Sequence, residues 1–221
     1  ETAIGLFPDV GGGYFLSRCP GRVGEWLALT GDTIGADAAI AYQLADGRLP
    51  ADQQLAVWEA LGAQRWDSGA AIQDFVASQF IANSADEYRA TGQIDQYFGL
   101  PTVGDIVAAL EAAGTDGARS TAATLRKRSP LMLHVVLEQI RRARGMDLAS
   151  DLRMERDMVR HCFFLRPGAS ETVEGIRALT VDKDHSPRWN PARIEDVSPE
   201  LVASFFVSPW PVHAHPLAHL R

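Results

Sequence analysis

Two carboxylates near the start of the chain have the residue type and setting for chemistry. Glu1 and Asp9 enclose the stretch "TAIGLFP", which holds apolar residues with one threonine, one glycine and one proline. An apolar setting raises the pKa of a carboxyl group and suits it to acid–base or nucleophilic work. The alternative is structural, because Asp9 stands just before a glycine run, where an acid can cap a helix. On the residues alone, both interpretations stay open.

A run of three glycines, Gly11, Gly12 and Gly13, follows Asp9 almost at once. It lacks the Lys-Ser/Thr pair of a phosphate-binding loop, and no GxGxxG pattern follows a strand. Glycine has no Cβ, so it lets a backbone approach another backbone or a ligand closely. We therefore expect the run to serve close approach and not nucleotide binding.

Glu155 is an acid on an apolar helix stripe, in register with Leu148, Leu152, Val159 and Cys162. A buried acid needs a partner. We predict a structural ion pair with Arg153, Arg156 or a residue elsewhere in the chain, and not a catalytic role.

Two other groups of residues offer ligands for a cation, and we predict a metal site at neither. Asp182 and Asp184 lie in "DKDHSPRW" without calcium-loop spacing, and a turn that holds Pro187 and Trp189 against the domain is favoured. A solvated, Pro-rich tail is the favoured interpretation of the last three histidines, His213, His215 and His219.

The dense basic residues of this acidic chain fall in two stretches, Arg126–Arg128 and Arg141, Arg142 and Arg144. They can hold ligand phosphates, but a solvated charged face is favoured.

Composition narrows the class of protein. The chain has 221 residues, of which 46% are hydrophobic and 22% charged, with a net charge of −7. Such an acidic chain is not expected to bind nucleic acid, and no apolar run approaches the roughly 20 residues that span a bilayer. Cys19 and Cys162 stand far apart, which argues against a disulfide framework and favours a reducing compartment. We expect a cytoplasmic protein, and, because a candidate site residue stands first, a segment of a longer one.

The pattern changes character at Pro50. Before it we predict strands over residues 2–7 and 44–50, with short helices between. After it, helical periodicity dominates. Apolar stripes predict helices in four places, near Leu55–Leu61, Ile72–Phe80, Val103–Leu110 and Leu133–Ile140. A long helix is predicted over 148–164, a shorter one near 170–179, and little regular structure from Val181 onward.

Four stretches together resemble a known family: "ETAIGLFPDVGGGYFLSR" at the start, "LALTG" at 27–31, "RMERDMVRH" at 153–161 and "EGIRALTVDKDHSPRWNP" at 174–191. They are similar to the 3-hydroxyisobutyryl-CoA hydrolase branch of the crotonase (enoyl-CoA hydratase/isomerase) superfamily. The resemblance runs from Glu1 to about Phe206. The pattern "DKDxxPxWxP" separates the hydrolase branch from hydratases and isomerases.

The resemblance implies an α/β crotonase-like fold, a spiral of ββα units with a helical C-terminal region, of which this chain is the mostly α part. It implies that residues 1–50 end the core that carries the acids and that residues 51–221 form the helical region. By the same resemblance, Glu1 is the catalytic carboxylate, as nucleophile or as base on water, and Asp9 the second active-site acid. Gly11 and Gly12 adjoin the substrate.

The implied reaction is hydrolysis of 3-hydroxyisobutyryl-CoA to 3-hydroxyisobutyrate and CoA, a step of valine catabolism. CoA is part of the substrate, so no separate cofactor is expected. The oxyanion amides belong to an upstream half that is not in this sequence, and we expect that half as a partner and residues 1–221 alone to be inactive. Homo-oligomerisation is left open. The alternatives are a hydratase or isomerase of the same fold, and a non-catalytic fragment or scaffold.

Overall fold

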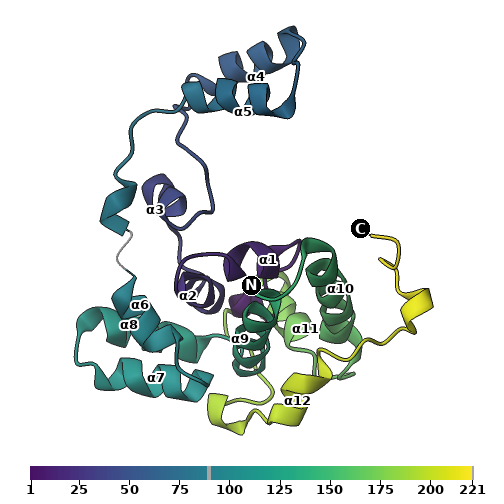
Figure 1. The fold of residues 1–221 in the computed structure, drawn as a ribbon. Helices are drawn as coiled ribbons and strands as arrows, with labels where there is room; N and C mark the ends of the chain where they lie inside the picture. Colours follow the sequence, from purple (N-terminus) through teal and green to yellow (C-terminus); the bar gives the residue numbers. More distant parts are fainter. Residues whose placement is uncertain (89–90, 221) are drawn as a thin grey trace. The chain divides into compact units, whose positions relative to one another are not determined.

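The structure, a computed structural model, describes residues 1–88 and 91–220 (Figure 1). The chain divides into two compact units. The larger unit comprises Glu1–Asp32 and Gly92–Arg221, and the smaller unit comprises Thr33–Thr91. The boundary predicted at residue 50 rests on another criterion, because it separates the acid-bearing segment from the helical region. The two compact units do not test this boundary, which stays a prediction.

The larger unit is built from helices. In chain order they are η1 (Thr2–Ile4), α1 (Gly12–Ser17), α2 (Val23–Thr30), α6 (Gly92–Phe98), α7 (Val103–Ala112), α8 (Asp116–Lys127), α9 (Pro130–Ala143), α10 (Leu148–Phe164), α11 (Glu171–Ile176), η3 (Arg177–Val181), η4 (Ile194–Asp196), α12 (Pro199–Ser204) and η5 (Val212–Ala214). The prediction that helices dominate after Pro50 is confirmed. No helix in the described part of the chain is both long and apolar enough to cross a membrane.

The smaller unit holds α3 (Ala36–Ala41), α4 (Gln54–Ala63), α5 (Gly69–Ser78) and η2 (Ala85–Tyr88). Arg48, between α3 and α4, contacts the segment that follows α5. The backbone of Arg48 pairs with Ile81, and its guanidinium donates to the Ala82 carbonyl at 2.8 Å. The predicted stripe on α4 is largely exposed within this unit: Leu55 is 66% exposed and Trp58 74%.

Both predicted strands are wrong. Residues 2–7 begin as the 3-10 turn η1, in which the Glu1 carbonyl accepts from the Ile4 and Leu6 amides. Residues 44–50 contribute a single bridge at Arg48. β-branched and aromatic content favours a strand only where a neighbouring strand can pair with it, and the described residues contain no strand outside that isolated bridge.

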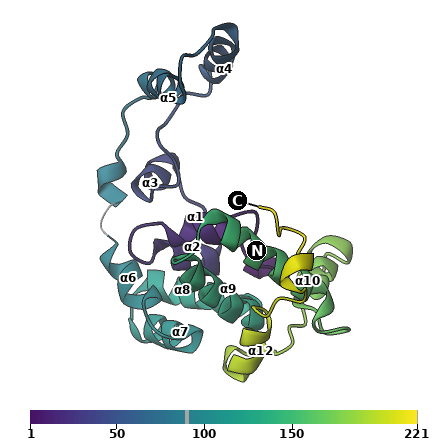
Figure 2. The same ribbon diagram turned by 45° about the vertical axis from the view of Figure 1, so that its right-hand side comes forward.

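Helix α9 lies at the centre of the larger unit. The hydroxyl of Ser129 accepts from the Met132 amide, and Pro130 occupies the first turn, so the start of the helix is well specified. Apolar side chains cover nearly all its faces and are almost fully buried. It packs against α1, α2, α7 and α12, and Figures 1 and 2 both show α1 and α2 beside it.

α6, α8 and α12 of the larger unit were not predicted from the sequence, and the buried faces of α8 and α12 are small or short. α8 buries Ala118, Ala122 and Leu125, a stripe made mainly of alanine, which carries little apolar contrast in a sequence. α12 begins at a Ser-Pro pair after the predicted irregular tail starts. The tail is less solvated than predicted, because residues beyond 207 hydrogen-bond to α10 (Figure 2).

Two glycines in helices make a matched stability test. A Cβ on Gly175 in α11 would lie 2.1 Å from the Ile4 carbonyl oxygen, whereas a Cβ on Gly117 in α8 meets nothing within 4 Å. We expect Gly175→Ala to lower the free energy of unfolding by about 2 kcal/mol, since backbone must move. Gly117→Ala should leave it equal or raise it by up to about 1 kcal/mol. Urea unfolding of both variants, in a protein that contains the whole chain, measures the difference. Equal effects would contradict the packing of η1 against α11.

Candidate active site

The opening segment is anchored by its middle and carries an acid at each end. Phe7 is fully buried and Pro8 is buried, whereas Glu1 is exposed and Asp9 half-buried. No hydrogen bond or ion pair joins either carboxylate to a described residue. Their predicted meeting at one substrate stays a prediction.

The glycine run allows the close approach that was predicted for it. A Cβ on Gly12 would lie 2.8 Å from the Cβ of Pro8, and a Cβ on Gly13 would lie 2.6 Å from Oδ1 of Asp151. Gly11 has a φ of 85°, in the left-handed region that favours glycine. The run thus turns the chain into α1 and admits an acid side chain against the helix start. Contact of Gly11 or Gly12 with substrate stays a prediction.

Glu155 is buried, as its place on the stripe indicated, but its predicted ion pair is wrong. Its two carboxylate oxygens accept hydrogen bonds from the Gly11 amide at 2.8 Å and the Gly13 amide at 3.0 Å. Arg153 instead donates to the Leu217 carbonyl, and Arg156 lies over the Trp210 ring. The partners of this acid are backbone amides, which no side-chain pattern in the sequence could have indicated.

Asp151, one turn before Glu155 on α10, completes an acid pair under the start of α1. Its Oδ2 accepts from the Tyr14 amide at 3.1 Å. Burial raises the pKa of Glu155 to about 7, and the neighbouring Asp151 adds to the rise while the two glycine amides oppose it. Burial likewise raises the pKa of Asp151, and the hydrogen bond from the Tyr14 amide and the charge of Arg18 oppose this rise. Two adjacent buried acids resist ionising together, because each negative charge disfavours the other.

A second buried acid, Glu171, joins the segment that contains Asn190 to the start of α9. It accepts from the Ser129 hydroxyl and, at 2.7 Å, from the Asn190 amide. The turn predicted for "DKDHSPRW" is held from within: Arg177 binds both Asp182 and Asp184 at 2.7 Å. Trp189 donates to the Lys127 carbonyl, so the predicted anchoring of this residue is observed.

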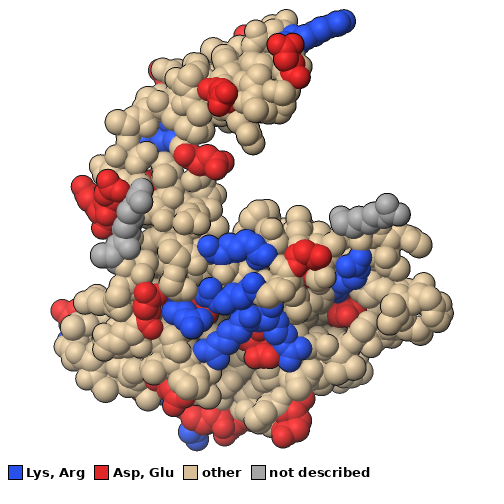
Figure 3. Space-filling model, viewed as in Figure 1, with Lys and Arg blue, Asp and Glu red and all other residues tan. Residues whose placement is uncertain are grey.

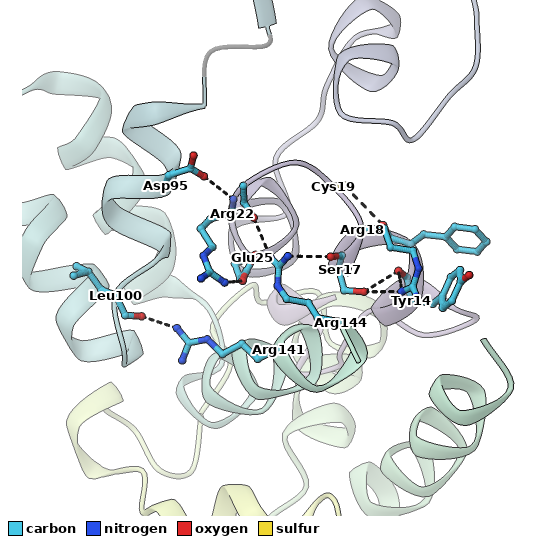
Figure 4. A network of polar contacts seen from close by, with 12 residues as sticks. Tyr14, Ser17, Arg18, Cys19, Arg22, Glu25, Asp95, Leu100, Arg141 and Arg144 are labelled. Carbon is cyan, nitrogen blue, oxygen red and sulfur yellow. Dashed lines mark hydrogen bonds and ion pairs between the residues drawn. The ribbon is translucent and has the colours of Figure 1, made fainter. Parts of the chain in front are cut away.

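A third buried acid, Glu25 on α2, organises the basic residues around α9 (Figure 4). Arg144 binds it at 2.7 Å and Arg22 at 3.0 Å, and its side chain is fully buried. Arg144 also donates to the Ser17 and Gly21 carbonyls. Lys and Arg side chains gather on the face where α1, α2 and α9 lie (Figure 3).

The two predicted basic stretches serve different partners. Arg141 donates to the Leu100 and Pro101 carbonyls, whereas Arg126 pairs with Glu111 and Glu195. These side chains are engaged in holding helices together, which is neither a free phosphate site nor a merely solvated face.

The C-terminal histidines also differ from prediction at one position. His215 lies 3.1 Å from Oδ1 of Asp157 on α10, and the two side chains are mostly buried. Among the described residues, no three His, Cys, Asp or Glu side chains are grouped to hold a metal ion.

An open cleft of about 520 Å³ lies between the start of α7, α9 and α12. Its lining includes Thr102, His134, Arg141 and Val202. Burial lowers the pKa of His134, which lies 3.1 Å from the Ile194 carbonyl. None of the four predicted site residues lines this cleft, so it is separate from the candidate active site.

Comparison with known proteins relates the chain to one family. The family model described as enoyl-CoA hydratase/isomerase matches residues 1–206. "Probable 3-hydroxyisobutyryl-CoA hydrolase 2" of Arabidopsis thaliana is 36% identical, over 93% of this chain and 56% of that protein. "Small ribosomal subunit protein mS47" of the same plant is 35% identical, over 93% of this chain and 52% of that protein.

Among solved structures, an enoyl-CoA hydratase from Rhodobacter sphaeroides is similar, with a TM-score of 0.80 and 34% identity. The match covers 95% of this chain and 58% of the hydratase chain. The chain thus spans about half the length of the curated relatives it matches.

The Glu25 cluster predicts a large cost for a small change. Glu25→Gln removes the charge that two arginines face, and we expect the free energy of unfolding to fall by about 2 kcal/mol or more, since unpairing a buried ion pair is costly. Glu138→Gln is the control, because Glu138 forms an exposed pair with Arg142 and should cost at most about 0.5 kcal/mol. Denaturant unfolding of both variants decides; equal losses would show that Glu25 is not the organising charge.

The acid pair predicts a pH dependence with a definite sign. The pKa of Glu155 rises from its ordinary 4.5 to about 7 on folding, so between these values the folded chain binds more protons than the unfolded chain. Stability from this group is therefore lost as pH rises through that window. A glutamine does not titrate, so the stability of wild type minus Glu155→Gln should fall between about pH 4.5 and 7. Unfolding measured across that range tests this, and a difference that stays flat would contradict it.

Proposed function

Because this chain belongs to the enoyl-CoA hydratase/isomerase family, we propose that a protein containing it hydrolyses an acyl-CoA thioester. The substrate we favour is 3-hydroxyisobutyryl-CoA, cleaved by water to 3-hydroxyisobutyrate and CoA, a step of valine catabolism. The carrying observation is the 36% identity, over 93% of this chain, with the plant protein named as a probable hydrolase of that thioester. The proposed fold of the whole protein includes the ββα spiral of the family.

In the proposed mechanism Glu1 acts on the thioester carbonyl. It either attacks the carbon to form an anhydride that water opens, or removes a proton from the attacking water. Asp9 hydrogen-bonds the substrate hydroxyl or carries a proton. In support, both carboxylates are unengaged by described residues, and the anchor between them, Phe7, is fully buried.

The oxyanion amides and most of the CoA contacts are proposed to come from the half of the protein that precedes this segment. The match to the relatives covers their C-terminal part, and each oxyanion donor is worth about 10²–10³ in rate. Residues 1–221 alone are therefore proposed to be inactive. CoA is part of the substrate, and no separate cofactor is proposed. A cytoplasmic location stays a prediction.

A structural role is the second candidate, and one observation favours it. A relative at 35% identity is named as a ribosomal subunit protein, so the same fold segment occurs in a protein named for an assembly. Hydratase or isomerase activity is a third candidate. Incubation with 3-hydroxyacyl-CoA and with enoyl-CoA separates the three. Release of free CoA marks the hydrolase, an interconverted acyl group marks the hydratase or isomerase, and no reaction with either thioester leaves the structural role.

The two acids give the sharpest test, in an active protein that contains the whole chain. Glu1→Gln keeps the shape and removes both nucleophilicity and basicity, so turnover of 3-hydroxyisobutyryl-CoA should fall by at least about 10²-fold with KM little changed. Asp9→Asn should lower turnover by about tenfold or more. If Asp9 recognises the hydroxyl, the loss is larger for the 3-hydroxyacyl thioester than for its deoxy analogue.

The control is Glu138→Gln, an equal chemical change at an exposed ion pair. The Asp9 carboxylate does not cap α1, whose N-cap is Gly11, so full turnover in Asp9→Asn would remove the proposed role of Asp9. Full turnover in Glu1→Gln would end the proposed mechanism.

A further inference from the structure

The side chain of Asp9 has no hydrogen-bonding partner among the described residues, so its position is set by its backbone. The Asp9 carbonyl accepts from the Gly12 amide at 2.9 Å, which closes a tight turn through Val10 and Gly11. Anything that fixes this turn therefore also fixes where the Asp9 carboxylate can lie.

The turn is strained at Val10. This residue has a φ of 54°, a left-handed conformation in which a β-branched side chain is a genuine outlier. Its side chain is 86% exposed, so packing of the side chain does not explain the conformation. Such a conformation persists only where the surrounding structure holds it, and such outliers cluster at functional sites.

The backbone on both sides of Val10 is held by buried side chains. Before it, the Pro8 carbonyl accepts from Gln139 Nε2 at 2.7 Å. After it, Glu155 receives the Gly11 and Gly13 amides, one on each carboxylate oxygen. Gln139 Nε2 also lies 3.5 Å from Glu155 Oε1, so the contacts before and after Val10 are linked through these two side chains.

The charged and titratable groups next to these hydrogen bonds lie on α10 and just after α1. Asp151, on α10, lies one turn before Glu155 and accepts a hydrogen bond from the Tyr14 amide. Arg18, just after α1, adds a positive charge near Asp151 and packs over the Tyr14 ring, 3.4 Å from its centroid. These contacts therefore join α10 to the start of α1, and Asp151 and Glu155 are both buried.

We propose that Glu155, supported by Asp151, is the positioning residue for the Asp9 carboxylate, because it holds the strained turn that presents Asp9 to the substrate. This inference rests on the proposed function, since it gives Asp9 a task in hydrolysis. Glu155 itself touches neither Asp9 nor the substrate; it acts through the Gly11 and Gly13 amides. Its effect on the reaction is therefore smaller than that of Asp9 and falls on turnover more than on binding.

The kinetic test uses an active protein that contains the whole chain. Glu155→Gln leaves one oxygen to accept a single amide, so the turn loosens and kcat should fall about five- to tenfold with KM changed less than about twofold. Glu138→Gln should leave both values unchanged. An unaltered kcat in a folded Glu155→Gln protein overturns the proposal.

A second substitution separates positioning from a general loss of structure. Asn adopts the left-handed conformation more readily than Val, so Val10→Asn relieves the strain that Glu155 otherwise holds. Added to Glu155→Gln, it should restore at least about half of the lost kcat. A loss that Val10→Asn leaves unchanged overturns the proposal.

Amide hydrogen exchange on the unmodified protein keeps the test open even where Glu155→Gln fails to fold. The Gly11 and Gly13 amides should exchange at least about 10²-fold more slowly than in an unstructured chain. Exchange at the unstructured rate overturns the proposal.

Asp9→Asn distinguishes the two failures. If it costs turnover while Glu155→Gln does not, only the positioning inference fails. If Asp9→Asn costs nothing, the proposed role of Asp9 fails, and the positioning inference fails with it.

Discussion

The larger unit depends on a buried carboxylate that meets backbone amides far away in sequence. Glu155 and Gly11 stand 144 positions apart, yet the amide donates to the carboxylate at 2.8 Å. A buried acid without partners is costly, and the first amides of a helix lack partners of their own. The carboxylate and the amides each supply the hydrogen-bonding partner that the other needs. Glycine at position 13 makes this possible, because any Cβ there would collide with Asp151.

Two other buried acids also join distant elements, but in the contacts that follow they do so through side chains. Glu25 on α2 binds Arg144, which follows α9, and Glu171 on α11 binds Ser129 at the start of α9. The acids on α2 and α10 tie the first 32 residues to the helices after residue 92, which is how a unit made from two separated stretches coheres. Buried pairs of this kind contribute little net stability but specify which elements meet. Apolar burial around α9 supplies the bulk of the driving force.

This framework bears directly on the candidate chemistry. The proposed acids, Glu1 and Asp9, have no hydrogen-bonding partner among the described residues, whereas Glu25, Glu155 and Glu171 are buried and hydrogen-bonded. Phe7 and the Gln139–Pro8 contact fix the segment between Glu1 and Asp9. The two groups of acids differ in solvation: Glu155 is buried and already accepts two amides, whereas the Glu1 carboxylate is exposed to solvent and open to a substrate. The two acids of the proposed site thus flank a firmly held segment, and the proposal assigns the remaining contacts of an acyl-CoA to parts of the protein outside residues 1–221.

The sequence by itself determined the family, through "ETAIGLFPDVGGGYF" and "DKDHSPRWNP", and the helices whose stripes contrast strongly, such as α7, α9 and α10. It also indicated that Glu155 is buried. Tertiary structure alone decided the partners of Glu155, because backbone amides carry no side-chain pattern, and it decided that residues 2–7 form a turn, because a strand needs a neighbour that these residues lack. α8 stayed hidden because its buried face is built largely of alanine. A helix can be predicted from the sequence when its side chains alternate regularly in polarity. Long-range hydrogen bonds to the backbone form only when the helices pack, so the sequence does not show them.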